Sequence, residues 1–93
     1  DMDIARALYL TEQYSEARQK AQEVLTFIAP YDMPYEKAVL YNLLGLTHTD
    51  EGDFELAETM LKAGIEQALL TGNPRVPALL HNSFSELGLA RKD

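Results

Sequence analysis

The sequence predicts an all-α protein built from repeated pairs of antiparallel helices, and three observations support that prediction. Residue types recur at a spacing of 40 residues, apolar residues follow a helical periodicity, and Pro, Gly and Asn stand where helices should begin or end. Repeats of about 20 to 50 residues are typical of solenoids, in which each unit buries its apolar face by stacking on the next. We therefore expect an α-α superhelix.

A shift of 40 residues along the chain superimposes identical residues in several places. The pairs are Pro34 and Pro74, Ala38 and Ala78, Leu40 and Leu80, Asn42 and Asn82, Ala17 and Ala57, and Asp53 and Asp93. This register divides the chain into repeats at about 1–33 and 34–73 and a half repeat at 74–93. A chain of 93 residues is too short to hold two separate cores, so we expect a single domain of two and a half repeats.

Five antiparallel helices are predicted, at about residues 1–11, 14–29, 34–50, 54–71 and 74–90. The second and fourth show the i, i+3, i+4, i+7 spacing of an amphipathic helix. Their apolar residues are Tyr14, Ala17, Ala21, Val24, Leu25 and Ile28, and one repeat later Phe54, Ala57, Leu61, Gly64, Ile65 and Ala68. Pro34 suits the first position of the third helix, the turn 51–53 ends it, and Asn73 can cap the fifth.

Composition excludes several classes of function. The formal charge of −7 opposes contact with phosphate backbones and anionic membrane surfaces, so we expect no direct nucleic-acid or membrane contact. The chain has no Cys, which removes disulfides and thiolate chemistry and is typical of a cytoplasmic protein. No apolar run reaches the roughly 18 to 20 residues of a membrane span, and the acidic start at Asp1 is unlike a signal peptide. Because the chain does not start with Met, we expect it to be a fragment of a longer protein.

The middle unit carries a specific motif. It consists of Tyr41, Leu44, Gly45, His48, Gly52-Asp53-Phe54 and Ala57. These residues resemble the tetratricopeptide repeat (TPR), and the 40-residue period, longer than the usual figure of about 34, resembles the long-helix subclass of that family. The resemblance implies a TPR-like solenoid that binds a protein or peptide within a larger bacterial signalling or transcription-regulatory protein. The small residues also predict close helix packing, with Gly45 where the two helices of the unit cross.

No arrangement of residues predicts catalysis. The chain has no glycine-rich phosphate loop and no His-Glu-x-x-His motif, and its two histidines, His48 and His81, stand where the repeat places packing aromatics. The acidic stretch from Asp50 to Glu58 lacks the spacing of a calcium loop, and Asp53 is better placed to cap a helix. We expect no enzyme activity, no metal and no cofactor.

Asn42 and Asn82 are the strongest candidates for a binding site. The register places both on the first helix of their units, which lines the concave face of such solenoids, and an Asn side chain can pair with the main chain of an extended peptide. We expect both to project on the same side and to be partly solvent-accessible. The alternative is an inter-helix or solvent-facing polar role. The other residues predicted to share this face are Val39, Leu43, Leu46, Leu79 and Glu86, with Arg6 and Tyr9 in the first unit.

The half repeat suggests a second kind of contact. Leu80, Phe84 and Leu87 share one side of the last predicted helix, where a complete unit would cover them with its own second helix. Unless the preceding helix pair absorbs them, they form an exposed apolar strip and predict a homodimer through this helix. The alternative to peptide binding is therefore a structural spacer or self-association domain.

Overall fold

The computed structural model describes residues 13–91, and this part of the chain folds into four α-helices without a strand. They are α2 (Tyr14–Ile28), α3 (Pro34–Asp50), α4 (Phe54–Leu70) and α5 (Arg75–Arg91). Their bounds confirm the all-α class and four of the five predicted helices, each end differing by at most one residue from the prediction. The helix predicted at 1–11 lies outside the described residues.

Local signals in the sequence set the ends of the helices. Pro34 occupies the first turn of α3, where its missing N–H costs no hydrogen bond. Asp53 precedes α4 and its carboxylate accepts a hydrogen bond from the Leu56 amide at 3.5 Å. Asn73 caps the start of α5 in the same way, with its Oδ1 accepting from the Arg75 amide at 3.0 Å. The capping roles expected of Asp53 and Asn73 are confirmed.

Two glycines allow the chain to turn back between helices. Gly52 follows α3 with φ of 85° and Gly72 follows α4 with φ of 72°. This left-handed conformation strains residues that have a Cβ atom, which is why glycine is favoured after the last turn of a helix. The turns after α3 and α4 are therefore short, and consecutive helices lie side by side.

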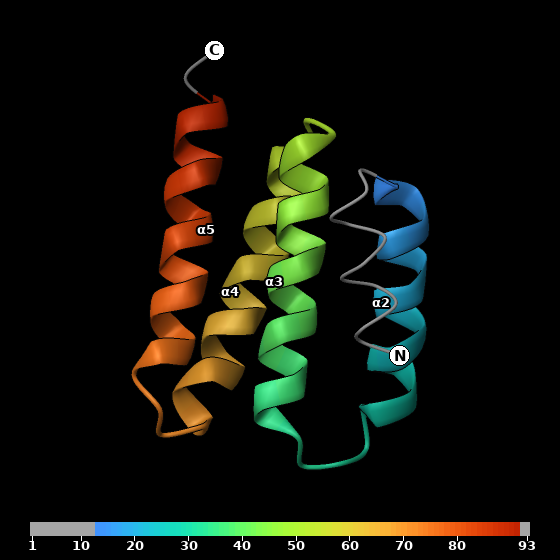
Figure 1. The fold of residues 1–93 in the computed structure, drawn as a ribbon, viewed down its shortest axis with the longest axis vertical. Helices are drawn as coiled ribbons and strands as arrows, with labels where there is room; N and C mark the ends of the chain where they lie inside the picture. The colour runs from blue at the N-terminus through green and yellow to red at the C-terminus, as the bar shows by residue number, and fades with distance from the viewer. Residues whose placement is uncertain (1–12, 92–93) are drawn as a thin grey trace.

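The four helices run alternately up and down, with α3 between α2 and α5 and with α4 behind it in the view of Figure 1. Helix α3 packs against each of the other three described helices, and α5 packs against both α3 and α4. More than half of α3 is buried as a result, including Leu40, Leu44 and Thr47. Helix α3 is thus the centre of the described structure.

Small residues bring the helices close together. A Cβ atom at Gly45 on α3 would lie 2.5 Å from Cγ of Leu61 on α4, so the leucine side chain occupies the place of the missing one. Gly64 on α4 plays the same part, because a Cβ atom there would lie 2.7 Å from Cδ1 of Leu80 on α5 and 3.1 Å from Cβ of Tyr41. The predicted position of Gly45, at the crossing of the two helices of the middle unit, is confirmed.

None of the described helices combines the length and the apolar character that crossing a membrane requires.

Candidate functional site

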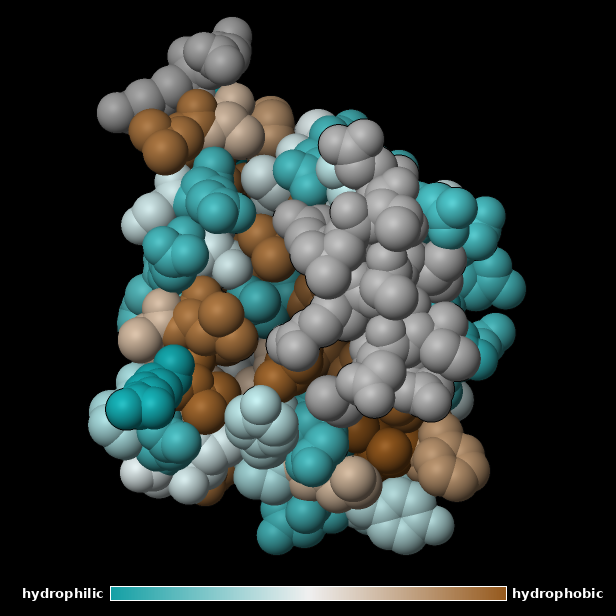
Figure 2. Space-filling model, viewed as in Figure 1, coloured by the Kyte–Doolittle hydropathy of each residue, from teal (hydrophilic) through white to brown (hydrophobic). Residues whose placement is uncertain are grey.

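Three of the residues predicted to line a binding face lie on the exposed side of α5. Leu79, Asn82 and Glu86 stand at i, i+3 and i+7 on this helix and therefore share one face. All three are exposed, Leu79 by 40% of its surface. Figure 2 shows hydrophobic atoms interspersed with polar ones along the part of the molecule that α5 occupies. An apolar side chain beside an amide and a carboxylate can contact both the side chains and the main chain of a polypeptide.

Helix α3 contributes less to this face than the sequence predicts. Val39 and Leu46 are only partly buried, but Leu43 is buried and belongs to the core cluster formed with α2. Leu43 was expected to line the groove, and its burial corrects that expectation. Leu43 packs between the central helix α3 and its neighbour, as leucines spaced along one side of a helix commonly do in a core.

Asn42 is not accessible, contrary to the prediction for it. Only 7% of its surface is exposed, and its Oδ1 accepts a hydrogen bond of 2.5 Å from Oγ of Ser83 on α5. Ser83 is itself buried and also donates to the main-chain oxygen of Leu79 at 3.3 Å. The Asn42 amide therefore joins α3 to α5. The prediction that both asparagines are accessible is wrong for Asn42.

Asn82 and Asn42 differ because their helices have different neighbours. Helix α5 covers Asn42, whereas Asn82 is exposed on α5 itself. The 40-residue register treats the two positions as equivalent, but it carries no information about which of them a neighbouring helix covers. Arg6 and Tyr9, the other predicted members of the face, lie outside the described residues.

The apolar strip predicted for self-association is absorbed by the chain itself. Leu80 is fully buried and Leu87 is 2% exposed, and Phe84 packs partly buried against the same core cluster. The space for Leu80 is provided by Gly64, whose missing side chain lets the two helices approach. The expectation of an exposed strip is wrong, and the reason for expecting a dimer through it is removed.

His48 is the titratable group most affected by its surroundings. It is buried at the end of α3, as expected for a histidine in an aromatic packing position. Burial lowers the pKa of its imidazole below the usual value, and the positive charge of Arg18 lowers that pKa further. The carboxylates of Asp53 and Glu51 act in the opposite direction and only partly offset this. His48 is thus held neutral, as a packing group.

One acidic residue in the turn after α3 and one in α4 have structural partners. Glu51 pairs with Arg18, and Glu58 pairs with Arg91 and with Lys62. These two cations lower the pKa of the Glu58 carboxyl through hydrogen bonds and charge. Among residues 13–91 no group of three or more His, Asp or Glu side chains is arranged to hold a metal ion.

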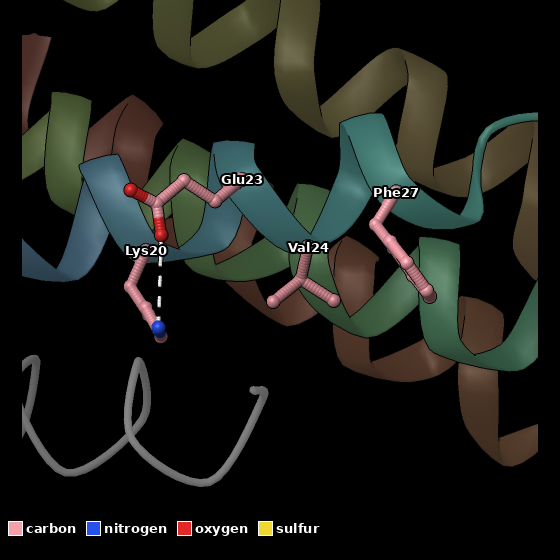
Figure 3. Close-up of a pocket in the computed structure, with 4 residues that line it drawn as sticks. All are labelled: Lys20, Glu23, Val24 and Phe27. Atoms are coloured by element: carbon pink, nitrogen blue, oxygen red, sulfur yellow. Dashed lines mark ion pairs between the residues drawn. The ribbon is translucent and has the colours of Figure 1, made fainter.

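Two surface hollows were not singled out from the sequence. The first lies along one face of α2, where Figure 3 shows the side chains of Lys20, Glu23, Val24 and Phe27 projecting from the same side of the helix. Lys20 and Glu23 form an ion pair at 3.6 Å, and Phe27 is highly exposed. Their i, i+3, i+4, i+7 spacing is visible in the sequence, but it mixes charged with apolar residues and predicts no particular ligand.

The second hollow lies where α2, α3 and α4 meet. Its lining residues are Leu25, Thr26, Ala29, Lys37, Tyr41 and Gln67. Lys37 donates from Nζ to the main-chain oxygens of Ala29 at 3.1 Å and Tyr31 at 2.6 Å. Its charge thus serves the carboxyl end of α2, where a cation is favourable. This hollow has a structural cation at its edge rather than a free one.

Comparison with family models, with curated proteins and with solved structures finds no match to this chain.

Proposed function

We propose that the chain is a TPR-like protein-interaction module that receives an extended peptide or a segment of a partner protein along α5 and the adjoining part of α3. The observation that carries the proposal is the shared exposed face of Leu79, Asn82 and Glu86 on a helix that is packed firmly on its other side. A rigid helix with an exposed apolar anchor and two polar groups loses little conformational freedom when it binds a partner.

The regular arrangement of the helices supports the repeat part of the proposal. Helices α2 and α4 begin 40 residues apart, at Tyr14 and Phe54, and α3 and α5 begin at Pro34 and Arg75. Helix α3 lies against α5, so the first helices of two successive units are neighbours, as a superhelix requires. The resemblance of the middle unit to TPR proteins supports a role within a bacterial signalling or transcription-regulatory protein.

The buried Asn42 changes the mechanism of the proposed binding. With Asn42 bound to Ser83, the two asparagines do not form a pair of clamps on a peptide main chain. Asn82 then supplies the polar contact, Leu79 supplies the apolar one, and Glu86 favours a cationic residue in the partner. The formal charge of −7 favours the same kind of partner.

A second candidate function is a structural spacer, and the Asn42–Ser83 hydrogen bond favours it. This bond uses the strongest predicted binding group to hold α3 to α5. In a spacer the exposed face of α5 would remain without a partner in the cell.

A binding screen with matched variants distinguishes the two functions. The chain is presented to an array of short peptides that differ in charge and apolar content, and saturable binding is measured by fluorescence anisotropy. We expect Leu79→Ser and Asn82→Ala each to raise the Kd of a bound peptide by about fivefold or more, as the loss of one contact implies. Leu70→Ser, at an exposed leucine on α4, is the control and should leave binding unchanged.

If no peptide binds saturably, or if the α4 control weakens binding as much as the α5 variants do, the proposed face is wrong and the spacer is favoured.

A further inference from the structure

Two ion pairs join helices at the same end of the molecule. Arg18, in the second turn of α2, pairs with Glu51, which directly follows α3. Arg91, the last residue of α5, pairs with Glu58 in the second turn of α4, with 2.8 Å between Nη2 and Oε2. Each pair thus links the start of one helix to the end of the following unit's first helix.

The two pairs are the same contact with the charges exchanged. The 40-residue register relates position 18 to position 58 (18 + 40) and position 51 to position 91 (51 + 40), and the partners are 33 residues apart in both pairs. In the first junction the cation is Arg18 on α2, the second helix of its unit. In the second junction it is Arg91 at the end of α5, the first helix of its unit. A crossed junction would therefore place Arg18 against Arg91, or Glu58 against Glu51.

The two helices that carry Arg18 and Glu58 begin in a similar way. Ala17 and Ala57 precede Arg18 and Glu58, and both alanines are fully buried. Tyr14 and Phe54 begin the two helices. Repeated helices can be exchanged between two copies of a chain out of register, with α2 of one copy in the place of α4 of the other. Exchange in register keeps both ion pairs and is not opposed by charge. Packing distinguishes the two junctions at one position, since α2 carries Val24 where α4 carries Gly64 to make room for Leu80, and opposite charge distinguishes them in addition.

Additional contacts hold the second pair in place. Arg91 also donates from Nη2 to the main-chain oxygen of Phe54 at 3.0 Å, and Glu58 also accepts from Nζ of Lys62 at 2.9 Å. The carboxylate is therefore held by a contact within its own helix before the junction closes, and the guanidinium gains a second acceptor once α5 docks on α4. A charge that is fixed in position discriminates between correct and incorrect partners better than one on a freely moving side chain.

We propose that the exchanged polarity of these two pairs is a pairing code, which keeps each helix pair docked in its own register and opposes the shifted exchange in which α2 of one copy takes the place of α4 in another. The code acts during folding, when α2 or α4 can meet the end of either α3 or α5. It needs no bound partner, and it acts independently of the binding face on α5.

The test reverses one junction. The double variant Arg18→Glu with Glu51→Arg keeps the ion pair and the net charge, but gives both junctions the same polarity. Donor- and acceptor-labelled copies are unfolded together in denaturant and refolded at high concentration, and energy transfer between copies reports exchange. The chain has no Cys, so one Cys placed at exposed Gln19 in the donor copy and one at exposed Ser85 in the acceptor copy provide unique labelling sites.

We expect the exchanged fraction to rise by at least about fivefold in the double variant, because two crossed contacts change from repulsive to attractive. The difference should shrink in about 1 M salt, where the Debye length falls to roughly 3 Å and interactions between more distant exposed charges are screened. Reversing the second junction as well, by adding Glu58→Arg and Arg91→Glu, should restore the low fraction. That variant and its reference both carry Lys62→Gln, which removes the cation beside position 58.

Circular dichroism first establishes that each variant refolds to the same helix content. If Arg18→Glu with Glu51→Arg does not refold, Glu58→Arg with Arg91→Glu in the Lys62→Gln background makes the two polarities equal from the other side. An exchanged fraction equal to that of the natural chain would overturn the proposal. So would equally high exchange when both junctions are reversed, since the effect would then come from substitution and not from polarity.

Discussion

The close contact between Gly45 and Leu61 predicts how a larger side chain at position 45 changes stability, because a gain in helix propensity opposes a cost in packing. Gly45→Ala adds one Cβ atom in the interior of α3, at a point 2.5 Å from Cγ of a leucine that is fully buried. Replacing Gly by Ala within a helix stabilises the folded state by about 0.8–1.0 kcal/mol. Forcing an extra carbon into a packed core costs about 1–3 kcal/mol. The free energy of unfolding should therefore fall by about 0–2 kcal/mol.

Gly88 on α5 provides the matched control. It lies in the last turn of a helix of the same length, and a Cβ atom there would have no neighbour within 4 Å. Gly88→Ala should gain the helix-propensity term alone, at most about 0.8–1.0 kcal/mol, the value for a helix interior. The two variants, which make the same chemical change, should differ by about 1–3 kcal/mol in the free energy of unfolding.

Urea unfolding followed by circular dichroism measures both variants against the natural chain. A difference of 1 kcal/mol corresponds to about 4–8 °C in Tm for a domain of this size, so thermal unfolding gives a second measure. Gly45→Leu adds three more carbons at the same point and should lower Tm clearly. If Gly45→Ala stabilised the protein as much as Gly88→Ala does, the close packing of α3 on α4 would be refuted.

Three further predictions follow from the buried groups. Asn42→Ala should lower the free energy of unfolding in urea by about 1 kcal/mol, because it removes a buried hydrogen bond between α3 and α5 while the Ser83 hydroxyl keeps the Leu79 carbonyl as an acceptor. Exposed Asn82→Ala should change that free energy by less than about 0.5 kcal/mol, and equal effects of the two variants would contradict the structural role of Asn42. The free energy of unfolding should fall as pH drops below about 6.5, because the lowered pKa of His48 makes the unfolded state bind the proton more readily than the folded state does. His48→Gln should reduce the change of the urea midpoint between about pH 7.5 and 5.5, and an unchanged pH dependence would exclude His48 as its cause. Light scattering should give the natural chain and Phe84→Asp the same mass, with no dimer lost on substitution. The reason is that this side of α5 already packs on its own chain.

The helices could be predicted from the sequence because local interactions define them. Pro34, Asp53 and Asn73 act on the turns next to them, and their effect does not depend on the rest of the fold. The position of Gly45 could also be predicted, since the 40-residue register and the resemblance to a known repeat together specify where the two helices cross.

The binding face could be predicted only in part, because it depends on what covers each helix. Asn42 and Asn82 are equivalent in sequence, and only the position of Ser83 on the neighbouring helix shows that one of them is buried. Leu80 likewise looked exposed in a half repeat, because the sequence pattern does not reveal that Gly64 makes room for it. Such contacts between distant residues require the packed structure.

The exchanged ion pairs were hidden for a related reason. A comparison by residue type scores Arg18 against Glu58, and Glu51 against Arg91, as mismatches. Only the contacts show that the two mismatches compensate each other, so that the pair is preserved while each of its members changes.

The proposed role in binding a polypeptide is tested most directly by mapping a bound peptide onto the chain by nuclear magnetic resonance. Main-chain amide signals are recorded while a peptide selected on the array is added to saturation. The account predicts that the largest shifts occur at Leu79, Asn82 and Glu86 on α5. Shifts that concentrate instead at the hollow around Thr26 and Gln67, or the absence of any saturable shift, would contradict it.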